Sequence, residues 1–171
     1  MASQRVTPSV SPVKVLNVVR SSRAKAETLE RSHPSVTETI RLDLPSRIEA
    51  VAEAANAVAK IVNRLGFGEE AVFAIDVSVR EAVINAVLHG NKRDESKTVE
   101  VAFKSRPDAL EIEVRDQGQG FDAAEVPDPT LPENIMKTSG RGLFLIRNFM
   151  DEVEWFRNPG GGSIVRMVKR L

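Results

Sequence analysis

The stretch Arg80–Asn91, which reads R-E-A-V-I-N-A-V-L-H-G-N, most constrains what this chain can fold into. At 100° per residue, the apolar residues in and before this stretch form two stripes on nearly opposite sides of one helix. The first stripe comprises Ile75, Val79, Ala82, Val83, Ala86 and Val87, and the second comprises Val77, Ile84 and Leu88. A helix that is apolar on two sides is expected to lie buried between other elements.

A narrow polar strip separates the two apolar stripes. It holds Ser78, Glu81, Asn85 and His89, the last three at i, i+4 and i+8. A buried carboxylate and a buried amide each need a partner, because an unpaired polar group is costly. The strip therefore predicts a helix side that faces a pocket. A satisfied Glu–Asn pair in the core, or a partly exposed helix, explains the strip equally well when it is taken alone.

Composition excludes several classes of protein. The 171 residues suit one domain with an appendage, and the equal numbers of basic and acidic residues give no sign of a polyanion or membrane partner. The absence of cysteine excludes disulfides and thiolate metal sites, so any metal is expected to be a hard cation held by oxygen atoms. No apolar run reaches transmembrane length and no secretory signal follows the N-terminus. We therefore expect a cytoplasmic protein that binds neither membranes nor nucleic acid directly.

Residues 1–35 form the expected appendage, and residues 36–171 form the expected domain. The appendage carries six Lys or Arg against two Glu, a net charge of +4. Prolines interrupt it at both ends. Its composition favours a flexible tail, with a short amphipathic helix over Val13–Arg31 as the alternative.

The first part of the domain has alternating apolar and polar residues, followed by an Ala-rich segment. Period-2 alternation before Pro45 predicts a strand. Ser46 is the expected N-cap of a helix over Arg47–Leu65, with Glu49 at the capping-box position. Gly66 is the expected stop signal of this helix.

A second helix and a hairpin are expected next. The helix runs from Glu69 to about Leu88, with Gly90 at its C′ position. Alternating residues then predict two strands around 99–103 and 110–114, joined by the turn Arg106–Ala109. The two strands are therefore expected to pair antiparallel.

The last third of the chain begins with a long loop, Phe121–Ser139, which has three prolines and little periodicity. A helix from Gly140 to about Met150 and two strands, Glu152–Phe156 and Ser163–Val168, complete the domain. The sum is an α+β fold: a two-layer α/β sandwich with two or three helices on one face of a mixed, mostly antiparallel five-stranded sheet.

A glycine motif, Asp116-x-Gly118-x-Gly120, follows the second hairpin strand directly. An aspartate there can accept a hydrogen bond from an exocyclic amine such as that of adenine. Glycines allow the backbone to approach a ligand closely or to take a positive φ. Taken alone, the motif is more typical of an acidic, glycine-rich turn than of a ligand site.

A second glycine motif, Gly140-x-Gly142, opens the third helix. Free N–H groups and the positive end of the helix dipole favour phosphate there, and Thr138 and Ser139 add hydroxyl donors. An ordinary hinge and N-cap is the structural alternative.

In combination, the three motifs resemble the N, G1 and G2 boxes of the histidine-kinase-like (GHKL) ATPase superfamily. The segments E-A-V-I-N-A-V-L-H-G-N, V-R-D-Q-G-Q-G-F and G-R-G-L-F-L-I-R-N-F-M-D-E-V are most similar to anti-sigma-factor serine kinases of the RsbW and SpoIIAB type. The resemblance covers residues 36–171 and implies the Bergerat ATPase fold. The N-terminal appendage lies outside it.

The resemblance also assigns roles to residues. It implies that Asn85 binds Mg²⁺, that Glu81 is the general base, and that Asp116 contacts the adenine amine. The other implied nucleotide contacts are Gly118, Gly120, Thr138, Ser139, Gly140, Arg141, Gly142 and Leu143. His89 is expected to be structural.

By resemblance, the function is that of an ATP- and Mg²⁺-dependent protein-serine kinase and anti-sigma factor. Such a protein phosphorylates a STAS-domain anti-anti-sigma partner, sequesters a sigma factor in transcriptional stress responses, and forms a homodimer. One alternative is a non-catalytic ATP-binding module that sequesters a regulator. A second is the catalytic domain of a histidine kinase, for which His33, beside Pro34, is a poor phospho-acceptor.

Overall fold

The computed structural model of the chain describes residues 15–21, 37–120 and 141–171. In chain order the elements are β1 (Val15–Ser21), β2 (Thr37–Pro45), α1 (Glu49–Leu65), α2 (Glu69–Asn85), the π-helix η1 (Ala86–Gly90), β3 (Thr98–Ser105), β4 (Ala109–Arg115), α3 (Arg141–Phe149), β5 (Glu152–Arg157) and β6 (Ser163–Arg170). Within the described ranges, no helix is long and apolar enough to cross a membrane.

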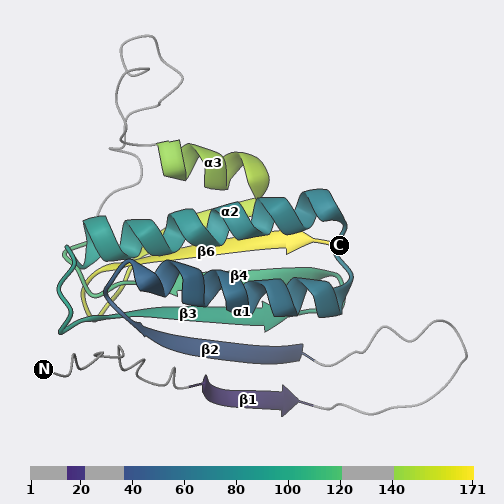
Figure 1. The fold of residues 1–171 in the computed structure, drawn as a ribbon, viewed down its shortest axis with the longest axis horizontal. Helices are drawn as coiled ribbons and strands as arrows, with labels where there is room; N and C mark the ends of the chain where they lie inside the picture. The colour runs from purple at the N-terminus through teal and green to yellow at the C-terminus, as the bar shows by residue number, and fades with distance from the viewer. Residues whose placement is uncertain (1–14, 22–36, 121–140) are drawn as a thin grey trace, which may run out of the picture.

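One sheet and one layer of helices make up the fold. The sheet has the strand order β1-β2-β3-β4-β6-β5, and every neighbouring pair is antiparallel. Figure 1 shows α1 and α2 lying side by side across one face of the sheet, with α3 next to α2. The predicted α+β class and two-layer sandwich are confirmed. The five predicted strands are all present, and β1 adds a sixth.

The N-terminal appendage contributes that sixth strand. Residues 15–21 pair antiparallel with β2, with Val15 opposite Leu42 and Ser21 opposite Thr37. The alternative of a helix over Val13–Arg31 is therefore wrong for these residues. Three valines among the seven residues favour an extended backbone, and the free edge of β2 supplies hydrogen-bond partners. The prediction of a flexible tail covers residues 1–35, of which 1–14 and 22–35 lie outside the described ranges.

The core lies between the sheet and the helices. The strand residues that face it alternate along each strand as predicted, and the helix residues come mainly from α1 and α2. The largest fully buried side chains are Phe103, Leu44, Ile75, Leu110, Ile112, Ile146 and Met167. The predicted turn closes the β3–β4 hairpin, where the Arg106 N–H donates to the Ala109 carbonyl over 2.8 Å.

The amphipathic pattern of α2 is only partly confirmed. All six residues of the first stripe are buried, but Val77, Ile84 and Leu88 of the second stripe are half-buried. The second stripe is therefore covered less completely than the first.

The start of α1 differs from the prediction. The helix begins at Glu49 with Ile48 as its N-cap residue, and no side chain caps it. The predicted Ser46 cap and Glu49 capping box are therefore wrong. A tight turn precedes the helix, because the Arg47 N–H donates to the Pro45 carbonyl, and the Ser46 N–H donates to the Lys97 carbonyl. The predicted stop is confirmed, since Gly66 has a left-handed φ of 79°.

The end of α2 also differs from the prediction. Gly90 is not a left-handed C′ residue, because the helix continues through η1 as far as Gly90. The Asn91 N–H donates to the Ala86 carbonyl over 2.7 Å, an i to i−5 bond that closes a π-turn. The left-handed residues come later, at Lys92 (φ 56°) and Arg93 (φ 59°).

Candidate functional site

A pocket lies where α2, α3 and the ends of the central strands meet. It contains one residue from each of the three sequence motifs: Asn85, Asp116 and Leu143. The other lining residues are Ala82, Ala86, Val114, Ile146, Trp155, Ser163 and Val165. Segments that are distant in the sequence therefore contribute to one cavity, as the motif prediction requires.

Glu81 and Asn85 lie one turn apart on the side of α2 that faces α3. Both side chains are half-buried. Gly142, in the first turn of α3, lies against both: a Cβ atom there would collide with Oε2 of Glu81 and lie 3.4 Å from Nδ2 of Asn85. A side chain at residue 142 would therefore require the Glu81 carboxylate to move, and the start of α3 lies over Glu81 and Asn85.

The amide of Asn85 lacks a partner within the part of the chain that the structure describes. Its Nδ2 atom is buried and makes no hydrogen bond there. Because this N–H donor borders the pocket, it is placed to bond an acceptor oxygen of a ligand bound there. Of the predicted polar strip, Asn85 lines the pocket.

The amide oxygen of Asn85 is a suitable ligand for a hard cation. The amide oxygen of Asn85 is a neutral, hard ligand, and Mg²⁺ in nucleotide sites takes few protein ligands because phosphate oxygens and water complete its shell. Among the described residues, no group of three or more Asp, Glu or His side chains forms a separate metal cage. The amide oxygen of Asn85 would therefore suit a Mg²⁺ ion that takes its other ligands from outside the chain.

Asp116 is the buried acid of the pocket, with 5% of its surface exposed. Its Oδ1 accepts a hydrogen bond from the Gly118 N–H at 2.8 Å, and its own N–H donates to the Ser163 carbonyl at 3.0 Å. Burial raises the pKa of the Asp116 carboxyl above its ordinary value, and the hydrogen bond from Gly118 opposes this shift. A carboxylate whose orientation is fixed by such a hydrogen bond can accept another from an amine of a ligand.

Three glycines allow the backbone to surround Asp116. A Cβ atom at Gly90 or at Gly162 would lie 2.7 Å from Oδ1 of Asp116, and one at Gly118 would collide with the Gly90 carbonyl. Gly120 has a left-handed φ of 77°, which favours glycine. Gly118 and Gly120 of the Asp116-x-Gly118-x-Gly120 motif therefore serve close packing and turn geometry around the acid.

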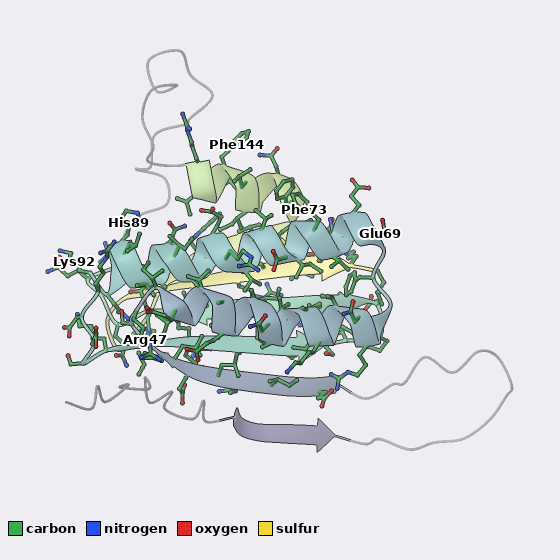
Figure 2. The ribbon with its side chains drawn as sticks, viewed as in Figure 1. Arg47, Glu69, Phe73, His89, Lys92 and Phe144 are labelled. Carbon is green, nitrogen blue, oxygen red and sulfur yellow. The ribbon has the colours of Figure 1, made fainter. Side chains whose placement is uncertain are left out.

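The residues of the third motif are only partly described. Arg141 is exposed at the start of α3, and Leu143 lines the pocket. Thr138, Ser139 and Gly140 lie outside the described ranges, so their predicted phosphate contacts stay predictions. His89 is exposed near the end of the helix that carries η1 (Figure 2) and is not among the residues that line the pocket.

Trp155 and Ser163 line the pocket but were not predicted from the sequence. Trp155 comes from β5, and the guanidinium carbon of Arg147 lies 4.8 Å from its ring centroid, a cation–π contact. Trp155 lies in the predicted strand Glu152–Phe156, which carried no indication of a pocket. Ser163 had no sequence signal of a site residue. It comes next to Asp116 only because β6 pairs with β4, where the Ser163 carbonyl accepts the Asp116 N–H.

Comparison with known proteins agrees with this geometry. Residues 44–169 match the family described as Histidine kinase-like ATPase domain. The chain is 36% identical over 140 residues to Serine-protein kinase RsbW of Halalkalibacterium halodurans, covering 78% of this chain and 84% of the relative. It is 32% identical over 138 residues to the protein of the same name from Oceanobacillus iheyensis, covering 77% and 86%. The same name applies to a Listeria monocytogenes relative, 32% identical over 129 residues, covering 72% and 82%.

Proposed function

The chain belongs to the histidine kinase-like ATPase family, and from this premise we propose that it is an ATP-dependent protein-serine kinase that acts as an anti-sigma factor. In this proposal it phosphorylates a serine of a STAS-domain anti-anti-sigma protein and sequesters a sigma factor. One observation carries the proposal: Gly142 packs directly against Glu81 and Asn85, beside a pocket that contains Asp116. The relatives named Serine-protein kinase RsbW support the choice of a serine as acceptor.

Each polar residue of the site has a separate task in the proposal. Asp116 accepts a hydrogen bond from the adenine amine of ATP, and the pocket walls exclude water from the base. Asn85 would hold Mg²⁺, which when bound neutralises phosphate charge. The backbone at Gly142 approaches the phosphates closely, because glycine leaves no side chain between α3 and α2. Positioning of this kind supplies most of the acceleration in phosphoryl transfer.

Glu81 accepts the proton of the acceptor serine at a carboxylate oxygen. A serine hydroxyl has a pKa far above neutrality, so the proton moves late, as the bond from oxygen to phosphorus forms. A positioned general base contributes about 10²–10⁴-fold to the rate. Glu81 makes no hydrogen bond or ion pair with the described part of the chain, so its carboxylate is available for this task.

A transfer assay tests the proposal. The protein is incubated with γ-labelled ATP, Mg²⁺ and a STAS-domain protein, and label on the acceptor is measured. Glu81→Gln is expected to lower the transfer rate at least about 10²-fold while the affinity for ATP stays within about threefold. The matched control is Glu69→Gln, in the exposed first turn of α2, which should behave as wild type.

Two outcomes contradict the kinase. ATP binding without transfer to any STAS-domain protein tested identifies a non-catalytic module that only sequesters its partner. Unchanged transfer by Glu81→Gln removes the general-base role. The homodimer and the cytoplasmic location are further parts of the proposal, and light scattering of the purified chain measures the first of them.

A further inference from the structure

Asn91 is almost completely buried, with 1% of its surface exposed, although it is a polar residue in a connecting segment. Both ends of its side-chain amide are used. Oδ1 accepts a hydrogen bond from the Gln117 N–H at 2.7 Å, and Nδ2 donates to the Thr98 carbonyl at 2.9 Å. A buried amide with both ends paired specifies one arrangement of the segments that it joins.

A third hydrogen bond closes this network. The side-chain Oε1 of Gln117 accepts a hydrogen bond from the Thr98 N–H at 3.0 Å. Asn91, Thr98 and Gln117 therefore form a triangle between the end of η1, the start of β3 and the residue after Asp116. None of these three residues lines the pocket.

The same point of the fold joins the two halves of the site. Asn91 ends the helix that carries Asn85, since its N–H closes the π-turn onto Ala86. Gly90, one residue earlier, packs against Asp116 so closely that no Cβ atom fits between them. A shift of this helix end therefore moves Asn85 and Asp116 relative to one another.

We propose that Asn91 is a positioning residue that holds Asn85 and Asp116 at the separation one nucleotide requires. This inference rests on the proposed ATP site. Asp116 binds the base and Asn85 lies at the phosphate end, so one ATP molecule spans both. Two subsites held at the correct separation bind a linked ligand far more tightly than its separate parts, because the second contact is intramolecular. Asn91 therefore acts on ATP without touching it.

The test compares ATP with its two parts. Calorimetry or NMR titration measures the binding of ATP, adenosine and Mg²⁺-tripolyphosphate to the full chain and to Asn91→Ala. We expect the affinity for ATP to fall at least about tenfold, while the affinities for adenosine and tripolyphosphate each change less than about threefold. Asn56→Ala, an exposed asparagine on α1, is the matched control and should change none of the three affinities.

A second pair of variants keeps the test independent of folding. Gln117 is exposed, so its replacement is tolerated more easily than that of Asn91. Gln117→Ala removes the hydrogen bond from the Thr98 N–H and should weaken the binding of ATP but not that of its separate parts. Gln117→Glu keeps an acceptor oxygen and should bind ATP as wild type does. Thermal unfolding confirms that each variant is folded.

Two results overturn the inference. The first is an equal loss of adenosine and ATP affinity, which means that Asn91 only supports Asp116. The second is unchanged ATP affinity in both Asn91→Ala and Gln117→Ala. Failure of the proposed kinase is a different result, because a wild-type chain that binds ATP without transferring phosphate leaves this binding comparison intact.

Discussion

Gly142 and Glu81 lie in such close contact that a Cβ atom at residue 142 would collide with the Glu81 carboxylate. The contact joins the first turn of α3 to the polar strip of α2. It brings the proposed phosphate-binding backbone to the proposed general base, and a side chain at residue 142 would force the Glu81 carboxylate to move.

Replacing Gly142 tests this contact. In Gly142→Ala the new methyl group displaces Glu81 or lifts the start of α3, so phosphoryl transfer is expected to fall at least about tenfold. Gly160→Ala is the matched control, because a Cβ atom there meets nothing closer than Oδ1 of Asn158 at 3.9 Å. The measurement is the transfer rate at saturating ATP. Equal rates for the two variants would show that Glu81 and α3 need no fixed separation.

Asp116→Asn tests the base-binding role. The amide keeps an acceptor for the Gly118 N–H but lacks the negative charge that favours an amine donor, so ATP affinity is expected to fall at least about tenfold. Asp108→Asn, in the exposed β3–β4 turn, is the control and should bind ATP as wild type does. Titration calorimetry measures both. Undiminished ATP affinity in Asp116→Asn would rule out the proposed contact.

The pH dependence of stability gives Asp116 a second test. Burial raises the pKa of this carboxyl above its ordinary 3.8, so the folded chain holds the proton more tightly than the unfolded chain. Asp116 therefore lowers stability as the pH rises from 3.8 through the raised value, and the loss persists at neutral pH. Without ligand, Asp116→Asn should gain thermal stability relative to wild type as the pH rises. A difference that does not vary with pH would contradict this.

Glu111, on the sheet face opposite the helices, is predicted to affect stability alone. It is 5% exposed and pairs with Lys104, Arg106 and Arg166. Burial alone would raise the pKa of Glu111, but these cations outweigh it and hold the pKa below 4.5. Glu111→Gln should therefore lower the free energy of unfolding by about 1–3 kcal/mol at neutral pH and leave ATP affinity unchanged.

The sign of this effect is checked by acid titration. A lowered pKa stabilises the folded chain above the ordinary value, and this stabilisation is lost as the pH falls below 4.5 through the folded-state pKa. The difference between wild type and Glu111→Gln should shrink in that range. Glu95→Gln, at an exposed position, is the control. If it lowers stability as much as Glu111→Gln does, the ion pairs of Glu111 are not the source of the effect.

Trp155 provides an optical signal for the pocket. It is the sole tryptophan, it lines the cavity, and Arg147 stacks on its ring. ATP should change its fluorescence in a saturable way, with a dissociation constant that agrees with calorimetry. Arg147→Ala should shift the emission of the free protein, because the cation leaves the ring face. Calorimetric binding of ATP without any fluorescence change would place the nucleotide away from Trp155.

The sequence alone determined the class of fold and most of the helices and strands. Alternation with period 2 predicted β2, β3 and β4, and β5 and β6 were predicted as two closing strands. The double stripe of α2 identified a helix that packs on more than one side. These patterns are local, so they can be read without knowing what packs against them. The same reading failed at the ends of helices, at Ser46 and Gly90, because tertiary hydrogen bonds and close contacts replaced the expected caps.

Only the tertiary structure decided how the motifs combine. Sequence spacing does not show that Gly142 touches Glu81, that Gly90 and Gly162 enclose Asp116, or that Trp155 and Ser163 line the pocket. These contacts depend on the order of the strands and on the packing of α3 against α2. The sequence therefore predicted the polar strip of α2. It did not predict that the start of α3 packs on this strip, because that contact depends on residues far apart in the chain.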